Sequence, residues 1–246
     1  MIKLIGISGK ICSGKTTLSN ALIKEYGYTR MVIAQPIKEI GQCYIKYHKS
    51  SIKSDRLALF QSVKFVEELK KILFDLFCTD KSQMYSAVLS KVERAQDMLF
   101  YDVFPRFQTI DSSVEKNDDI RNLYQTIGNV FRDAFGDDIW VKAMIKRIKD
   151  DKESKGFVCD DVRQKSEYTT MKDFGFKIIR LEISSEEQLK RCNRAYGDVN
   201  PARFTHISEI DLDDVNDFDL IIKNGTSLED SFDMSKKYIE TRRGVL

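Results

Sequence analysis

Short apolar runs alternate along the chain with longer stretches in which apolar residues recur every three or four positions. The runs are bounded by polar or turn-forming residues and predict five strands, at 4–7, 31–34, 157–159, 178–183 and 220–222. The stretches between them predict helices. Strands that alternate with helices are typical of an α/β fold with a mostly parallel sheet flanked by helices. In such sheets ligands bind at the carboxyl ends of the strands.

Two of the predicted helices carry a start signal of their own. Ser184 is followed three residues later by Glu187, and Thr226 by Glu229, which is the spacing of a capping box. Each box comes directly after a predicted strand. This order is the one that a strand–helix unit requires.

A long glycine-free stretch separates the second and third predicted strands. No glycine occurs between Gly41 and Gly128, and apolar residues repeat there at helical spacing. We expect a single domain over residues 1–246 with a helical insertion at 48–120, within which the polar section 111–119 forms a loop. A strand–helix connection needs only a few residues, so an insertion of this length favours a substrate-binding role; a purely structural helical pair is the alternative.

Composition restricts the class of protein. With 246 residues, 42% of them apolar, the chain can bury a full core. We find no run of 18 apolar residues and no leader pattern, so we expect neither a membrane span nor export. The five cysteines are scattered and never spaced C-x-x-C. This argues against a disulfide framework or a structural zinc site and favours the cytoplasm.

Charge does not indicate a nucleic-acid partner. Forty basic and 38 acidic residues give a net charge of +2. A local basic cluster at 142–149 is followed by two aspartates, which favours a solvated helix face. The two histidines, His48 and His206, are too few to predict a metal site or a catalytic triad, and we assign them structural or surface roles.

Residues 9–16, GKICSGKT, match the phosphate-binding-loop pattern G-x-x-x-x-G-K-[ST]. A predicted strand precedes the segment and a helical pattern follows it. Glycines let successive backbone N–H groups face the phosphates of a nucleotide, and the next helix begins at the anion. Lys15 would reach the β- and γ-phosphates, and Thr16 would hold Mg²⁺. The sequence therefore predicts a nucleotide site with a magnesium ion.

The end of the third predicted strand carries two carboxylates and an arginine. Asp160 and Asp161 precede Arg163, and Glu167 lies four residues further on. A carboxylate at this edge can orient the waters of Mg²⁺ or accept a hydrogen bond from a substrate hydroxyl, and Arg163 can clamp a phosphate. An ordinary aspartate-rich loop is the alternative.

A second polar set lies at 123–132, LYQTIGNVFR. It combines an amide, a glycine and an arginine at a helix turn, which can offer a base-edge contact, a close backbone approach and a cation, Arg132, for phosphate. Trp140 follows. It is either a stacking platform or a core residue, and its helical spacing from Val141 and Ile145 favours the core.

A basic stretch rich in helix breakers follows the fourth predicted strand and its helix. Arg191, Arg194 and Arg203 lie in or near it, together with Gly197 and Pro201. We expect residues 191–216 to form a mobile lid that supplies arginines to a transferring phosphoryl group. A solvated loop with ordinary arginines is the alternative.

Several short motifs in order carry a resemblance over nearly the whole chain. They are the loop at 9–16, AQPIK at 34–38, the glycine segment at 124–128, WV at 140–141, DVRxxxE at 161–167, THISE at 205–209 and NGTSLE at 224–229. With them the chain resembles bacteriophage deoxynucleoside monophosphate kinases. The resemblance implies a P-loop α/β core of the nucleoside monophosphate kinase type, with a helical substrate-binding insertion and a lid. It also implies transfer of the γ-phosphoryl group of ATP to a deoxynucleoside 5′-monophosphate in viral nucleotide biosynthesis, giving ADP and a diphosphate.

The resemblance assigns residues by their place in these motifs. The residues that it implies for binding ATP and Mg²⁺ are Gly9, Ser13, Gly14, Lys15, Thr16 and Thr17, with Thr16 as the metal ligand. The residues that it implies for binding the monophosphate are Ile37, Lys38, Arg56, Arg121, Gly128, Asn129, Trp140, Asp161, Arg163, Glu167 and Thr205. The catalytic set is Lys15, Arg132, Asp161, Arg163 and Arg194.

The chain also departs from the family pattern. Asn129 stands where members often carry threonine, and the insertion between residues 50 and 119 differs strongly, so the motifs leave the accepted base open, modified pyrimidines included.

Other interpretations share the loop. A regulatory GTPase would need an Asn-Lys-x-Asp sequence, which the chain lacks. A kinase for hydroxymethylated bases within DNA would need an extended basic groove, which a near-neutral chain does not indicate. A kinase for another small phosphorylated metabolite and a non-catalytic nucleotide sensor are further alternatives, although a sensor needs no acceptor site. As partners we expect the monophosphate substrate, no membrane and no nucleic acid, with a homodimer as an option.

Overall fold

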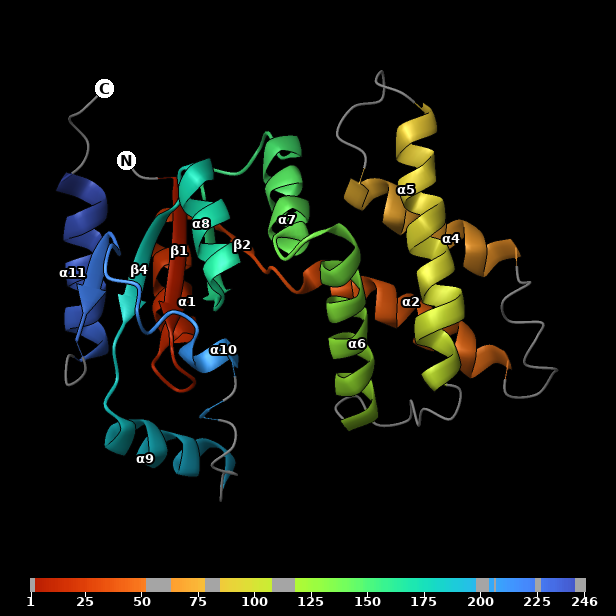
Figure 1. Ribbon diagram of the computed structural model, residues 1–246. Helices are drawn as coiled ribbons and strands as arrows, with labels where there is room; N and C mark the ends of the chain where they lie inside the picture. The colour runs from red at the N-terminus through yellow and green to blue at the C-terminus, as the bar shows by residue number, and fades with distance from the viewer. Residues whose placement is uncertain are drawn as a thin grey trace. The chain divides into compact units, whose positions relative to one another are not determined.

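The chain folds into two compact units (Figure 1). The computed structural model describes residues 3–51, 63–77, 85–107, 118–197, 204–205, 207–223 and 227–241. A sheet unit comprises Met1–Ile33 and Arg147–Leu246, and a helical unit comprises Ala34–Lys146. The helical unit therefore extends beyond the predicted insertion, 48–120, at both ends.

Five parallel strands form the sheet of the described residues. They are β1 (Leu4–Gly9), β2 (Thr29–Met31), β3 (Phe157–Val162), β4 (Lys177–Leu181) and β5 (Leu220–Ile222). Their order is β2-β3-β1-β4-β5, and Ile5 of β1 lies opposite Val158 of β3 and Lys177 of β4. The predicted α/β fold with a parallel sheet is confirmed.

The second strand lies two residues before its predicted position. β2 pairs Thr29 with Phe157 and ends at Met31, whereas 31–34 was predicted. Thr29 and Arg30 are exposed, while Ile33 is buried without being part of a strand. Of the predicted run, only Met31 pairs with β3 and only Ile33 is buried, so the apolar letters did not mark the strand.

Helices cover both faces of the sheet: α1 (Lys15–Tyr26) and α11 (Leu228–Thr241) pack on one face and α8 (Lys165–Phe174) on the other. α9 (Ser185–Tyr196) and α10 (Ile207–Ile210) lie beside the loop that follows β1. Gly6 of β1 shows why α8 can come close: Cε of Met171 lies 3.2 Å from the position that a Cβ on Gly6 would take. Of the described helices, none is long and apolar enough to cross a membrane.

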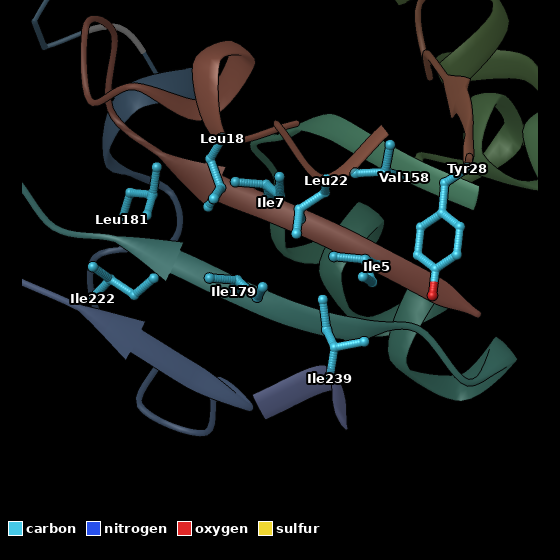
Figure 2. Packing of buried hydrophobic residues seen from close by; sticks show 10 residues of the cluster. All are labelled: Ile5, Ile7, Leu18, Leu22, Tyr28, Val158, Ile179, Leu181, Ile222 and Ile239. Atoms are coloured by element: carbon cyan, nitrogen blue, oxygen red, sulfur yellow. The ribbon is translucent and has the colours of Figure 1, made fainter. Parts of the chain in front are cut away.

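The main core lies between the sheet and the helices α1 and α11. Figure 2 shows isoleucines and leucines of β1, β4 and β5 that meet Leu18 and Leu22 of α1 and Ile239 of α11. Ile7, Leu22, Ile179 and Ile239 are 0% exposed. Burial of a side chain of this size contributes about 1.5–3 kcal/mol, so this cluster fixes α1, and with it the start of the phosphate-binding loop's helix, on the sheet.

The two predicted capping boxes have different outcomes. The Ser184 hydroxyl accepts a hydrogen bond from the N–H of Glu187 at 3.3 Å and caps α9, as predicted. Thr226 lies outside the described residues. The next helix, α11, is capped one residue later than predicted, because Ser227 Oγ accepts from the N–H of Asp230 at 3.0 Å. The segment TSLED also contains the spacing Ser-x-x-Asp, and this spacing supplies the cap that the described residues show.

The described part of the helical unit is made of helices. They are α2 (Gln35–Ser51), α4 (Val63–Phe77), α5 (Tyr85–Asp97), the π-helix η1 (Met98–Val103), the 3-10 helix η2 (Phe104–Phe107), α6 (Asp118–Phe135) and α7 (Ile139–Asp150), whose last residues belong to the sheet unit. The predicted loop at 111–119 is wrong at its end, because Asp118 and Asp119 form the first turn of α6, where acidic side chains are favoured. Residues 111–117 lie outside the described residues.

An aromatic core holds the helical unit together. The rings of Tyr44 and Phe104 stack with centroids 4.3 Å apart, and the Tyr44 hydroxyl donates to the carbonyl oxygen of Phe107 at 3.1 Å. Gly41 of α2 lets α6 approach, because a Cβ there would lie 2.6 Å from Cδ1 of Tyr124. α6 is therefore packed directly on α2.

Candidate functional site

The phosphate-binding loop follows the central strand of the sheet. β1 lies between β3 and β4, so the loop leaves the sheet at the point where the strand order reverses, the usual ligand position in open α/β sheets. Its backbone is unusual at three residues: Gly9 has φ 153°, Cys12 φ 61° and Gly14 φ 95°. A Cβ on Gly9 would lie 2.6 Å from Ser13 Oγ and 2.7 Å from the carbonyl oxygen of Leu181. Glycine at position 9 is therefore a structural requirement.

Lys15, the first residue of α1, folds its side chain back onto the loop. Its Nζ donates to the carbonyl oxygens of Gly9 at 2.6 Å and Lys10 at 2.7 Å, and the residue is 7% exposed. Burial, and in second place the charge of Arg163, lower the pKa of Lys15 to about 8. A phosphate group in the loop would favour the charged form and raise this pKa.

The hydroxyl groups of the loop fit a nucleotide. Ser13 Oγ is buried and has no hydrogen-bond partner within the part of the chain that the structure describes. Thr16 and Thr17 are exposed in the first turn of α1, a 12-residue helix whose N-terminal N–H groups attract anions. A single exposed hydroxyl suits Mg²⁺, which keeps most of its waters and takes further ligands from phosphates. No group of three or more His, Cys, Asp or Glu side chains that could hold a metal occurs among the described residues.

The two aspartates at the end of β3 have different surroundings. Asp160 is buried and binds the guanidinium of Arg30 through both oxygens, at 2.6 Å for Nη2 to Oδ2 and 3.1 Å for Nε to Oδ1. Asp161 is half-buried, and its Oδ1 accepts from the backbone N–H of Ile33 at 3.2 Å and from the thiol of Cys159 at 3.0 Å. Burial raises the pKa of the Cys159 thiol, so it stays a donor. Asp160 thus stabilises the sheet, while Asp161 keeps an exposed part.

Arg163 and Glu167 meet at the start of α8. Glu167 Oε2 accepts from the N–H groups of Arg163 at 2.8 Å and Gln164 at 3.0 Å and so completes a capping box. The Arg163 guanidinium donates from Nη1 to Oε1 of Glu209 at 2.8 Å. The sequence did not predict this contact, because the two residues are 46 positions apart. Glu209 belongs to the motif at 205–209 but was assigned no role of its own.

The helical unit brings several of the predicted acceptor residues together. Trp140 is 1% exposed, its Nε1 donates to the carbonyl oxygen of Gly128 at 3.1 Å, and its ring packs on Phe131 with centroids 5.1 Å apart. A Cβ on Gly128 would lie 3.3 Å from Ile37 Cδ1 and 3.5 Å from Arg132 Nη1. Ile37, Gly128 and Arg132 are therefore neighbours, and Trp140 is packed in the core behind Gly128.

Other predicted site residues are exposed or lie outside the described chain. Lys38, Arg121, Asn129, Arg194 and Thr205 are exposed; Arg121 lies 3.6 Å from Asp118, one turn earlier in α6. Arg191 pairs with Glu187 of the same helix at 2.7 Å. Arg56 and Arg203 lie outside the described residues, as does part of the predicted lid at 191–216.

Comparisons with known proteins agree over nearly the whole length. The sequence model of the deoxynucleotide monophosphate kinase family matches residues 3–234. A relative from Enterobacteria phage T4, which is named deoxynucleotide monophosphate kinase, is 24% identical over 258 aligned positions that cover 97% of this chain and 99% of the relative.

Proposed function

Because the chain belongs to the deoxynucleotide monophosphate kinase family, we propose that it transfers the γ-phosphoryl group of ATP, with Mg²⁺, to a deoxynucleoside 5′-monophosphate and releases ADP and the diphosphate. The observation that carries the proposal is the loop between β1 and α1. It combines a buried lysine, a buried serine hydroxyl that no described residue engages, and Gly9, where any Cβ would collide with neighbouring atoms. We place the reaction in the cytoplasm of an infected host.

The donor side of the reaction is assigned to the loop. Gly9 and Gly14 give the backbone its shape, Ser13 and Thr17 offer hydroxyl groups, and Lys15 neutralises the β- and γ-phosphates. Thr16 would hold Mg²⁺. An ion held there would supply positive charge to offset that of the phosphates.

The acceptor residues are assigned by their place in the family motifs, and each is described within its own unit. In the helical unit we propose Ile37, Lys38, Arg121, Gly128, Asn129 and Trp140, and in the sheet unit Asp161, Arg163, Glu167 and Thr205. Glu167 and Trp140 would act by placing other groups, since the first caps α8 and the second holds the Gly128 backbone. Arg56 stays a prediction outside the described residues.

Charge neutralisation is the main task of the catalytic set. Two anionic phosphates repel each other, and the transferring group spreads its charge over three oxygens in a loose transition state. Lys15, Arg132, Arg163 and Arg194 are the cations proposed to offset this charge, and Asp161 is proposed to act beside them. Most of the acceleration comes from holding donor and acceptor in line at short distance. Movement of the part of the predicted lid, 191–216, that carries Arg194 would bring this arginine to the reaction.

ADP release from Mg·ATP tests the proposal. The purified protein is offered each common deoxynucleoside monophosphate, the 5-hydroxymethyl pyrimidine forms, the matching ribonucleotides, and DNA that contains modified bases. We expect turnover with one or more deoxynucleoside monophosphates. Activity on DNA alone, or ATP binding without any transfer, would contradict it. Size measurement in solution decides whether the homodimer, which stays a prediction, exists.

Nucleotide binding is expected to take up protons at alkaline pH. Free Lys15, with a pKa of about 8, is largely neutral at pH 8.5, and phosphate oxygens raise its pKa, so the complex binds more protons than the free protein. We expect uptake of about 0.5 to 1 proton per ATP, and an ATP affinity that falls as the pH rises from 8 towards 10. Calorimetry in two buffers of different ionisation enthalpy measures the uptake.

Lys15→Arg is the matched control for this proton uptake. A guanidinium stays protonated throughout this range, so the uptake should vanish. Equal uptake by the variant and the natural protein would show that another group titrates.

Cys12 offers a chemical test of the loop. It is partly exposed within the loop, whereas Cys43, Cys159 and Cys192 are buried. A bulky thiol reagent should therefore block ATP binding, and ATP should protect the protein. Mass spectrometry confirms the modified residue, and Cys12→Gly, which also suits φ 61°, should be insensitive. Unchanged activity after confirmed modification of Cys12 would remove the residue from the nucleotide site.

A further inference from the structure

Two buried side chains from distant parts of the sheet unit hold the backbone of Ile11, inside the phosphate-binding loop. Glu209 Oε2 accepts from the N–H of Ile11 at 2.5 Å, and Gln188 Nε2 donates to its carbonyl oxygen at 3.3 Å. Gln188 is 4% and Glu209 7% exposed. Both polar groups of one loop residue are thus satisfied by side chains of α9 and α10.

The residue after Ile11 shows why this support matters. Cys12 has φ 61°, a left-handed conformation that costs a residue with a Cβ roughly 1 kcal/mol or more. Such a conformation persists when its surroundings determine it. The hydrogen bonds at Ile11 act on the peptide that leads into Cys12. They therefore restrain the part of the loop that carries the strain.

The second oxygen of Glu209 holds the arginine proposed to clamp phosphate. Oε1 accepts from Arg163 Nη1 at 2.8 Å; the glutamate side chain is 5% and the arginine side chain 37% exposed. The charge-assisted hydrogen bond that the planar guanidinium donates to this buried carboxylate fixes one of its edges, and its remaining donors keep a set direction. One carboxylate thus sets both the loop and Arg163.

The same segment reaches the loop a second time. Asp213 binds Lys10 Nζ at 2.9 Å and Arg180 Nη2 at 2.9 Å, and Arg180 in turn donates to the buried hydroxyl of Ser8 at 2.9 Å. Residues 209–213 are therefore attached to Lys10 and Ile11 of the loop and, through Arg180 of β4, to Ser8 of β1.

We propose that Glu209 is a positioning residue for phosphoryl transfer, which sets the Ile11–Cys12 backbone and the Arg163 guanidinium at the same time. The inference rests on the proposed function for its kinetic part, because Arg163 acts there on phosphate. Glu209 works through the loop and through Arg163.

Two substitutions separate the two contacts. In Glu209→Gln the amide oxygen can still accept from the Ile11 N–H, but the charge that holds Arg163 is lost. We expect kcat to fall about tenfold or more while KM for ATP stays within about threefold. In Glu209→Ala both contacts are lost, and KM for ATP should also rise about tenfold.

A matched control and a double variant complete the test. Glu25→Gln makes the same chemical change in an ion pair with Lys236, in the last turns of α1 away from the loop, and should leave both constants within about twofold. If Glu209 acts on turnover through Arg163, then Glu209→Gln should lower kcat little further in an Arg163→Ala background.

Three results would overturn the proposal. If Glu209→Gln keeps the kcat and KM of the natural protein, the carboxylate has no part in the reaction. If only its melting temperature changes, the carboxylate is merely structural. If it binds ATP more tightly, the carboxylate opposes phosphate binding. If the natural protein transfers phosphate to no monophosphate, the proposed function fails separately. Calorimetry then measures ATP binding by the natural protein, Glu209→Gln and Glu209→Ala. Binding about tenfold weaker in Glu209→Ala alone supports the role of Glu209 in setting the loop. Equal binding in all three proteins overturns that role.

Discussion

Lys15→Ala is expected to lower turnover at least about a hundredfold, because it removes a cation that offsets the charge of the transferring group, an effect of several kcal/mol. The fold should persist. Burial lowers the pKa of Lys15 to about 8, which means that the structure holds the charged form at a cost, so its removal leaves little stability to lose. Steady-state kinetics and thermal melting measure the two effects.

Lys24→Ala is the control, since Lys24 is an exposed lysine in the last turn of the same helix and should keep its activity. Near-normal turnover of Lys15→Ala would remove the lysine from the catalytic set. Loss of the folded state would show instead that its bonds to the Gly9 and Lys10 carbonyl oxygens hold the loop together.

Gly9→Ala should damage both fold and function. The added Cβ would meet Ser13 Oγ at 2.6 Å and the Leu181 carbonyl oxygen at 2.7 Å, and φ 153° is unfavourable for any residue with a Cβ. Because one of these atoms belongs to the backbone of β4, the loop cannot yield without shifting the strand. We expect a loss of about 2–4 kcal/mol in unfolding free energy and ATP binding weakened beyond detection at millimolar ATP.

Gly175→Ala separates strain from steric conflict. Gly175 ends α8 with φ 103°, and among the described residues other than its two chain neighbours none has an atom within 4 Å of the position of a Cβ. This variant should lose only about 1–2 kcal/mol and keep its activity. Equal losses in the two variants would mean that backbone strain alone, and not the contact with Ser13 and Leu181, makes glycine necessary at position 9.

The sequence predicted best where the signal is local. The loop, the strand before it and the helix after it form one continuous segment, and Ser184 caps α9 three residues from its partner. The parallel sheet follows from strands separated by helices. β2 was misplaced because this edge strand contains exposed Thr29 and Arg30, so its hydrophobic pattern is weak.

The supporting contacts of the site were beyond sequence reasoning. Glu209 lies 198 positions from Ile11, and Asp160 lies 130 positions from Arg30. In the sequence, a glutamate or an arginine that forms such a long-range contact cannot be distinguished from one that is exposed to solvent. Only the fold, which places α10 beside the loop and β2 beside β3, selects these partners.

The lysine that folds back onto the loop also bears on the thermodynamics of nucleotide capture. Its ammonium group has two carbonyl partners, and Ile11 is held by two side chains, so contacts within the chain itself order the loop. When a triphosphate binds, the Lys15 ammonium group would exchange its carbonyl partners for phosphate oxygens. Binding would therefore not have to order the loop and would not lose the conformational entropy that such ordering costs. The heat capacity of binding should accordingly be small, close to that expected for burial of the nucleotide alone.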